Sequence, residues 1–289
     1  MNYEYLPKPK AIKIKITSSY NKNLLKKSVI FSCSCENKTI KLWEDCNIQE
    51  NNKVEFPKIK RYLREVDLTN IEEVNIYSIG DGTSFDILNC YFKNNTTINS
   101  LEISSHECSS FSSFSNFIQK IRFINTLSFS KLCFLNQPIP SDYILPVIKK
   151  IKKLNIIECK CTNFVNSKMI QNLFLQNEDL KELSIFSKCN NFKNELIKEM
   201  KNRENVCNGD KDKHNEYVLI LSQTSDFDFE KEFSQYFSVD VYENYHLSSS
   251  FNDIICAAKF CDECNSHSTI TLSYSKSSIL PNCFVDTLC

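Results

Sequence analysis

Glycine is nearly absent from this chain of 289 residues, which contains only Gly80, Gly82 and Gly209. Phosphate-binding loops, dinucleotide-binding fingerprints and nucleophile elbows all need glycine where the backbone takes a positive φ or approaches a ligand closely. The sequence contains none of these motifs. The composition therefore excludes P-loop enzymes, Rossmann oxidoreductases, protein kinases of the ordinary pattern and α/β-hydrolases.

Excess charge and long apolar runs are absent too. The 35 Lys and Arg residues balance 35 Asp and Glu residues, so no net positive field attracts nucleic acid or anionic membranes. No apolar run approaches the roughly 18 to 20 residues that span a bilayer, and the first residues lack the apolar core of a signal peptide. We expect a cytoplasmic or nuclear protein whose partners are neither nucleic acid nor membrane.

Cysteine, by contrast, is plentiful, with 15 residues that are scattered along the chain and odd in number. Without an export signal, this pattern indicates reduced thiols rather than a disulfide framework. One segment, "CAAKFCDECNSH", approaches the spacing of zinc ligands, with Cys256, Cys261, Cys264 and His267 as the candidates. The segment has no second close pair, and Cys256 fits an apolar face, so we favour unpaired thiols and expect no metal or cofactor. A zinc-binding C-terminal module is the alternative.

The main positive signal is a repeated apolar pattern. An apolar residue is followed by two others, a second apolar residue, one other and a third apolar residue. The five copies are Ile71/Val74/Ile76, Ile98/Leu101/Ile103, Ile124/Leu127/Phe129, Ile151/Leu154/Ile156 and Leu180/Leu183/Ile185. Their first residues are 27, 26, 27 and 29 residues apart, and a period in this range is typical of solenoid proteins. Each copy predicts a short strand.

Between the copies, apolar residues recur at steps of three and four, which predicts helices with one apolar stripe. The stripes are Phe85/Leu88/Tyr91/Phe92, Phe114/Phe117/Ile118/Ile121, Ile144/Leu145/Ile148, Met169/Ile170/Leu173/Phe174 and Leu196/Ile197/Met200. Each repeat is thus predicted to form a strand, a turn, a helix and a return. In the turn "SIGDGTS", Thr83 or Ser84 is the expected N-cap of the next helix. A compact α/β domain of βαβ units is the alternative to a solenoid.

The pattern resembles the leucine-rich-repeat superfamily, whose unit is L-x-x-L-x-L-x-x-N/C. In "IKKLNIIECKC", Cys159 occupies the position of that family's buried Asn or Cys. The same position in the other copies holds Ile79, His106, Leu132 and Lys188. The period and the helical returns are similar to the ribonuclease-inhibitor-like class. The resemblance implies an α/β solenoid, and the irregular Asn/Cys position implies an irregular horseshoe.

The Asn-, Lys- and Ile-rich chain is also similar to the F-box-associated repeat families of nematodes. Those proteins carry a helical F-box before the repeats. Here only "LPK" (Leu6 to Lys8) corresponds to one, and no three-helix pattern follows it. The resemblance implies an adaptor or substrate-recognition subunit, with ubiquitin-ligase subunits among its partners.

The regions on either side of the repeats have their own patterns. The segments "AIKIKI", "KSVIFSCS" and "KTIKLWE" alternate apolar and polar residues, which predicts strands of a β-rich N-terminal cap. Toward the C-terminus, strand-like "EYVLILS", "SVDVY" and "STITLSY" alternate with helix-like "FEKEFSQYF" and "FNDIICAAKF", as degenerate or capping repeats do. We therefore expect a cap over residues 1–58, a solenoid over 59–200, a charged loop over 201–215 and capping repeats over 216–289.

The strand face of the repeats is the predicted binding surface. Residues between the apolar positions of a strand point away from the core and form rows across neighbouring strands. Tyr77, Ile157 and Phe186 are apolar or aromatic at such positions, as interface anchors are; the alternative is that a flanking loop covers them. The expected polar rim consists of Asn75, Glu102, Asn155, Lys153 and Glu182. The sequence thus predicts a non-enzymatic module that binds a protein partner.

A thiol-dependent enzyme is the competing hypothesis. His106 and Cys108 lie close together in sequence, and a cysteine nucleophile needs a neighbouring base. Proximity in sequence does not by itself bring the two side chains together, so we expect no catalytic residues.

Overall fold

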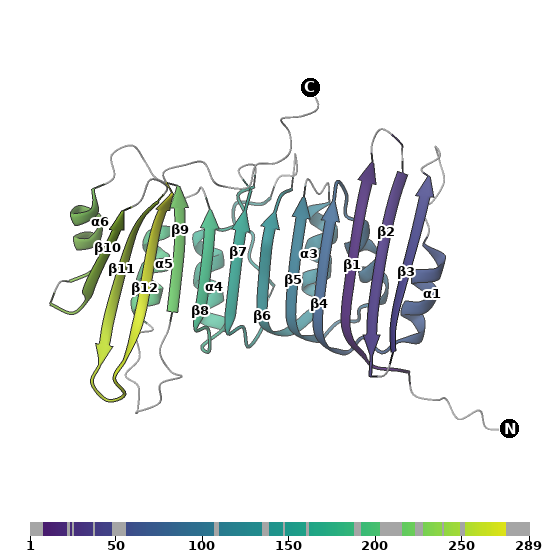
Figure 1. Cartoon of the computed structure of the whole chain (residues 1–289), viewed down its shortest axis with the longest axis horizontal. Coiled ribbons are helices and arrows are strands. Elements are labelled where there is room, and N and C mark those ends of the chain that lie inside the picture. The colour runs from purple at the N-terminus through teal and green to yellow at the C-terminus, as the bar shows by residue number, and fades with distance from the viewer. Residues whose placement is uncertain are drawn as a thin grey trace. The chain divides into compact units, whose positions relative to one another are not determined.

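A computed structural model of the chain describes residues 8–21, 24, 26–36, 38–47, 56–106, 110–134, 139–146, 148–159, 162–187, 192–202, 216–222, 228–238, 240–248 and 252–275. The protein is an α/β protein with a large, mostly parallel, open β-sheet (Figure 1). The strands are β1 (Ala11–Asn21), β2 (Lys26–Cys35), β3 (Lys38–Asn47), β4 (Asn70–Ile79), β5 (Thr96–His106), β6 (Ile121–Leu132), β7 (Lys153–Glu158), β8 (Glu182–Ser187), β9 (Glu216–Ser222), β10 (Glu243–Ser248), β11 (Asn252–Cys261) and β12 (Ser266–Ser275). The helices are α1 (Pro57–Glu65), α2 (Thr83–Tyr91), α3 (Phe111–Gln119), α4 (Ser167–Gln176), α5 (Lys193–Asn202) and α6 (Phe229–Tyr236).

The chain divides into two compact units. Unit 1 comprises Met1–Leu127, Cys133–Pro138 and Pro146–Lys149. Unit 2 comprises Ser128–Leu132, Ile139–Leu145 and Lys150–Cys289. Strand β6 contributes its first part to unit 1 and its last five residues to unit 2. Among the described helices, none is both long enough and apolar enough to cross a membrane.

In unit 1, a three-stranded meander extends a pair of parallel strands. The antiparallel strands β1, β2 and β3 form the meander, β1 pairs in parallel with β4, and β4 pairs in parallel with β5. Helix α1 begins at Pro57, and Glu44 on β3 accepts hydrogen bonds from the N–H groups of Lys58 and Ile59 at its N-terminus. The core contains the fully buried side chains of Ile14, Ile16, Val74, Ile76, Leu101, Ile103, Phe85, Leu88, Phe114 and Phe117.

Unit 2 has a corresponding arrangement. Strands β7, β8 and β9 are parallel, and β9 also pairs in parallel with β12. The antiparallel meander of β12, β11 and β10 then extends this sheet to its edge. The core contains the buried side chains of Leu154, Ile156, Leu183, Ile185, Leu219, Ile255, Leu272, Met169, Ile170, Leu196 and Ile197.

The predicted repeat strands are confirmed. Every apolar position of the five copies is at most 2 % exposed. The copies also pair position by position, because Val74 lies opposite Leu101 and Ile76 opposite Ile103, while Ile156 lies opposite Ile185. Four of the five predicted helices are present as α2, α3, α4 and α5. Cys159 is fully buried, and its N–H donates to the carbonyl oxygen of Leu132.

The predicted helix around Ile144, Leu145 and Ile148 is wrong. The described residues of 139–150 contain turns, extended chain and an isolated bridge at Lys149 but no helix. Pro146 lies within the expected stripe, and proline lacks the N–H that a helix interior needs. The apolar side chains of Leu145 and Ile148 are nevertheless buried. The spacing of these apolar residues therefore indicates that they are buried, but it does not indicate a helix.

Two predictions toward the C-terminus also need correction. The segment "FNDIICAAKF" was expected to be helical, but β11 (Asn252–Cys261) is a strand with β10 on one side and β12 on the other. Its continuous apolar residues suit a strand that packs on both faces, and pairing on both edges overrides the alanine pair's helical preference. The described residues of the expected strand "SVDVY" contain a turn at Asp240 and Val241 and no strand, and β10 begins one residue after Tyr242. The strands "EYVLILS" and "STITLSY" are confirmed as β9 and β12.

The turn before α2 is organised by Asp81 rather than by a hydroxyl N-cap. The N-cap position belongs to Gly82, which has no side chain to accept a hydrogen bond. Asp81 instead accepts from the N–H of Thr83 through Oδ1 and from its hydroxyl through Oδ2. Lys27 Nζ lies 2.9 Å from Asp81 Oδ2. This ion pair joins the β1–β2 hairpin to the start of α2, and it compensates for the burial of the carboxylate.

Candidate interaction face of the sheet

The two faces of the sheet differ in what covers them. In Figure 1 the helix α3 of unit 1 and the helices α4 and α5 of unit 2 lie behind the strands of their own unit, and the face of each unit toward the viewer, here called the open face, is free of these helices. Because side chains alternate along a strand, the residues between the buried positions lie on the open face. We describe this face first for unit 1 and then for unit 2.

In unit 1, Tyr77 is the predicted anchor and lies half-buried on β4. Its hydroxyl donates a hydrogen bond of 3.4 Å to Glu102 Oε2 on β5. Lys15 Nζ on β1 lies 5.1 Å from the centre of the Tyr77 ring. Burial, followed by the negative charge of Glu102, raises the pKa of the Tyr77 hydroxyl above its ordinary value. The ring is thus held between a cation and a carboxylate, and its edge stays accessible.

The polar residues near Tyr77 interact with one another. Asn75 Nδ2 donates to Glu73 Oε1 at 2.6 Å, and Lys13 Nζ lies 2.7 Å from the same carboxylate. The hydrogen bond from Lys13 lowers the pKa of Glu73 below its ordinary value. These groups are largely solvated, so such pairs contribute little to stability and form a polar rim.

Unit 1 also has apolar residues on the open face that the sequence reasoning missed. Trp43 on β3 is 68 % exposed and lies directly opposite Ile30 on β2, which is 53 % exposed. The same row continues through Thr17 on β1 to Tyr77 on β4. The alternation in "KSVIFSCS" and "KTIKLWE" was correct, but apolar residues occur on both faces of these strands. Ile30 and Trp43 each lie next to a buried residue of their strand. Because side chains alternate along a strand, this position places them on the open face.

In unit 2, the predicted anchors Ile157 and Phe186 are direct cross-strand neighbours on β7 and β8, and both are half-buried. The ion pair between Lys153 Nζ and Glu182 Oε1, at 2.6 Å, lies in another row of the same two strands. Asn155 Nδ2 donates to Ser128 Oγ at 3.1 Å. The structure therefore brings these predicted residues of unit 2 together. Tyr77, Asn75 and Glu102 belong to unit 1.

The row of Ile157 and Phe186 extends across the whole sheet of unit 2. Strand pairing places these side chains in one line on the open face, in the order Ile157, Phe186, Ile220, Ser273, Ile254 and Leu247. We call this line the apolar row. Leu247, on the edge strand β10, is 67 % exposed. Ser273 is buried although it lies on this face, because its apolar neighbours on β9 and β11 flank it.

Sequence reasoning found two of the six positions in the apolar row. The signal for Ile220 and Ile254 was continuous apolar sequence, "VLIL" in β9 and "IIC" in β11, whereas Ser273 and Leu247 lie in no such run. A strand with one solvated face alternates apolar and polar residues. A run without alternation therefore indicates that both faces of the strand have apolar contacts or serve binding.

The candidate zinc ligands are placed along the β11–β12 hairpin. Cys256 lies on the open face, where Thr271 Oγ1 approaches its Sγ at 3.7 Å. Cys261 is an odd number of residues away and therefore points to the other face of the strand. Cys264 is buried and His267 is exposed. Within the described ranges, no three His, Cys, Asp or Glu residues are grouped so as to hold a metal ion.

The enzyme hypothesis rests on Cys108 and His106. Cys108 lies outside the described residues. His106 is half-buried, and its Nε2 lies 3.1 Å from Ser104 Oγ.

The most strongly shifted carboxyl group is Glu158, on the helix-covered face of unit 2. Its Oε1 accepts hydrogen bonds from the N–H groups of Phe164 and Val165 at 2.5 and 2.7 Å, and its Oε2 accepts from the hydroxyl of Ser187. Burial raises the pKa of this carboxyl from 4.5 to about 7, although these hydrogen bonds lower it. These contacts join Glu158 to the return before α4 and to the end of β8. The arrangement holds a loop in place and presents no group to a substrate.

No protein-family model, no curated protein and no solved structure matches this chain.

Proposed function

We propose that this chain is a non-enzymatic interaction module that binds a protein partner through the open face of its sheet. The observation that carries the proposal is the apolar row of unit 2. Apolar residues exposed singly are normal on a protein surface, whereas contiguous exposed patches mark interaction sites. Five of its six positions hold Ile, Phe or Leu, and the row reaches the sheet edge at β10.

The composition of the row suits an interface core surrounded by a polar rim. Asn155 and Ser184 lie beside it on β7 and β8, with Lys153 and Glu182 in the row beyond them, and Tyr245, which is 55 % exposed, lies beside it on β10. Aromatic residues are enriched at the centres of protein interfaces, and charged residues are depleted there and lie mainly at the margins. The bound partner therefore presents an apolar ridge along the row and polar groups on either side.

The repeated strand and helix units favour a leucine-rich-repeat-like solenoid as the architecture behind this surface. A solenoid adds binding surface with each repeat without rebuilding its core. The period of 26 to 29 residues and the buried Cys159 support this assignment. A substrate-recognition or adaptor role in ubiquitin ligation is a special case of the proposal, in which ligase subunits are among the partners.

The proposal is tested by affinity capture of partners from a cell lysate. The variants remove apolar side chains either from the open face or from the helix-covered side. The test variant is Phe186→Ser with Leu247→Ser. The matched control is Leu175→Ser, because Leu175 is 76 % exposed on the helix α4. A second comparison, Ile30→Ser with Trp43→Ser, removes the exposed pair of unit 1. All variants must first show the melting temperature of the wild type.

We expect a specific partner that the wild type and Leu175→Ser retain and that the Phe186/Leu247 variant loses. Its direct binding to purified protein is then measured by titration. If the partner is lost only with the Ile30/Trp43 variant, binding belongs to unit 1 and the apolar row is not the site. If all variants capture the same proteins, the open face does not bind them and the proposal is wrong.

A further inference from the structure

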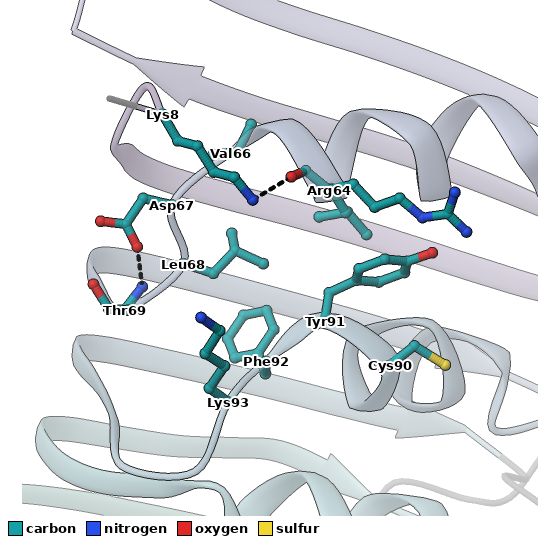
Figure 2. A pocket seen from close by; sticks show the side chains of 11 residues that line it. Lys8, Arg64, Val66, Asp67, Leu68, Thr69, Cys90, Tyr91, Phe92 and Lys93 are labelled. Atoms are coloured by element: carbon teal, nitrogen blue, oxygen red, sulfur yellow. Dashed lines mark hydrogen bonds between the residues drawn. The ribbon is translucent and has the colours of Figure 1, made fainter. Parts of the chain in front are cut away.

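A pocket of about 600 Å³ lies within unit 1, away from the residues of the open face described above. It is formed where α1 and α2 end and the chain returns to β4 and β5, and the segment before β1 closes one side (Figure 2). Small-molecule sites typically occupy about 300 to 1,000 Å³. The pocket is therefore large enough for a ligand with a ring.

The pocket has an apolar floor. Leu63, Val66, Leu68 and Phe92 line it and are buried in the core. Figure 2 shows Leu68 in the middle of the view, with the rings of Tyr91 and Phe92 beside it. An apolar group seated on this floor would lose contact with water, which is the main source of affinity for small ligands.

Three cationic side chains stand around this floor, and they come from three separate segments. They are Lys8 before β1, Arg64 in the last turn of α1, and Lys93 after α2. Lys8 Nζ donates to the carbonyl oxygen of Arg64. Within the described part of the chain, neither the guanidinium of Arg64 nor the ammonium of Lys93 has a hydrogen-bond or ion-pair partner. Asp67 is the one carboxylate that lines the pocket, and its Oδ1 accepts from the N–H of Thr69 at 3.0 Å.

The balance of charge in the pocket is positive. Three cations and one carboxylate leave two net positive charges among the lining side chains. The C-terminal ends of α1 and α2 each add about half a negative charge, so about one net positive charge remains. The positions of Arg64 and Lys8 are explained by favourable contact of a cation with the C-terminal end of a helix. That contact does not explain why an apolar pocket lies beside them. The combination of cations and an apolar floor is typical of a site for an amphipathic anion.

We propose that this pocket binds a small organic anion in which a carboxylate or phosphate group is joined to an apolar ring. The ring lies on Leu68 beside Tyr91 and Phe92, and the anionic group lies against Lys93, whereas the guanidinium of Arg64 lies across the pocket, toward Tyr91 (Figure 2). Asp67 opposes anion binding, because it places a like charge at the same pocket. A neutral ring lacks the ionic contacts, and inorganic phosphate alone lacks the apolar ones.

The first test is calorimetric titration of the full chain with four probes: phenyl phosphate, benzoate, phenol and inorganic phosphate. We expect phenyl phosphate or benzoate, or both, to bind at least tenfold more tightly than phenol and than inorganic phosphate. Comparison of the two anions tells which anionic group the pocket prefers. Equal binding of phenol, or no binding of either aromatic anion up to its solubility limit, overturns the proposal.

The second test uses variants at the rim of the pocket. Arg64→Gln combined with Lys93→Gln should weaken binding of the preferred anion about tenfold, since Lys93 loses its charged hydrogen bond to the anionic group and Arg64 no longer adds positive charge to the rim. Arg61→Gln is the matched control, because Arg61 is exposed on the same helix and does not line the pocket. Asp67→Asn should tighten binding several-fold, and its side-chain oxygen can still accept from Thr69. A variant with a damaged structure would not bind the anion more tightly than the wild type does. Weaker or unchanged binding by Asp67→Asn would therefore overturn the assignment. Equal losses of affinity in Arg61→Gln and in the double variant would overturn it as well.

Discussion

The buried carboxyl of Glu158 should make unit 2 less stable as pH rises, and Glu158→Gln should remove this effect. The side chain is fully buried, and burial raises its pKa from 4.5 to about 7. The folded state therefore keeps a proton between these two pH values that the unfolded state has released. A group whose pKa is raised on folding adds stability that is complete below pH 4.5 and is lost as pH rises through about 7.

The magnitude follows from the difference between the two pKa values. Each pH unit is worth about 1.4 kcal/mol at room temperature, so the change from 4.5 to about 7 corresponds to about 3 kcal/mol in the free energy of unfolding. Glutamine preserves the contacts of Glu158. Its Oε1 accepts from the N–H groups of Phe164 and Val165, and its Nε2 donates to Ser187 Oγ. Only the ionisation is removed.

The assay is urea unfolding of the wild type and of Glu158→Gln at pH 4.5, 6, 7 and 8. We expect equal stability near pH 4.5 and a variant that is more stable by about 3 kcal/mol at pH 8. Hydrogen exchange at Phe164 and Val165 gives a local measure, which is needed because the two units of the chain can unfold separately. The Glu158→Ala change leaves two buried N–H groups without acceptors and should destabilise at every pH by about 2 to 4 kcal/mol.

Two results would refute this reasoning. One is a stability difference between wild type and Glu158→Gln that does not change from pH 4.5 to 8. The other is a wild type that is more stable than the variant at pH 8. The first result would mean that the hydrogen bonds to the carboxylate balance the cost of its burial, and the second that they outweigh it.

Four further substitutions test the fold of unit 1 by urea or thermal unfolding. Asp81→Ala removes the buried partner of Lys27 and should cost about 2 to 4 kcal/mol, and a loss below about 1 kcal/mol would show that this ion pair is solvated. Gly80→Ala should cost about 1 to 2 kcal/mol, because Gly80 has a φ of +80°; no loss would contradict that backbone conformation. Ile103→Ala should cost about 2 to 5 kcal/mol, whereas the exposed Trp43→Ser should change stability by less than about 0.5 kcal/mol. Similar losses from the last two would contradict the placement of Trp43 on the surface.

The sequence predicted the elements that depend on local periodicity. The short strands around Leu154 and Leu183 and the helix containing Met169 follow from apolar spacing over a few residues. Each of these elements buries one stripe or one face, so its pattern records which side meets the core. The register between neighbouring copies was predictable as well, because successive repeats of equal design stack position by position.

The failures arose where local spacing had more than one explanation. The residues around Ile144 have helical spacing, but Pro146 prevents a helix, and Leu145 and Ile148 are buried from an irregular segment while Ile144 is exposed. The β11 segment is apolar at consecutive positions, which fits a buried helix and a doubly packed strand equally well. Only its pairing with both β10 and β12 decides between them.

The apolar row could not be assembled from the sequence because its members meet only through the order of the strands. Strand β12 is inserted between β9 and β11, so Ile220 and Ile254 lie on either side of Ser273. The parallel pairing of β9 with β12 joins segments that are distant in the sequence. No pattern within a single segment of the sequence predicts this pairing or the antiparallel pairing of β10 with β11.

The apolar row departs from the usual division of an open sheet into an apolar and a polar face. Unit 1 largely keeps this division, since Lys13 and Glu73 occupy its open face. In unit 2 five apolar residues lie along one line, four of them half-buried and Leu247 exposed, and Ser273 is buried among them. Scattered exposed residues need no explanation, but a continuous line of them loses contact with water only when a partner covers it. Leu247, at the exposed end of the line, lies on the edge strand. Its substitution therefore removes contact area with the least disturbance of the core.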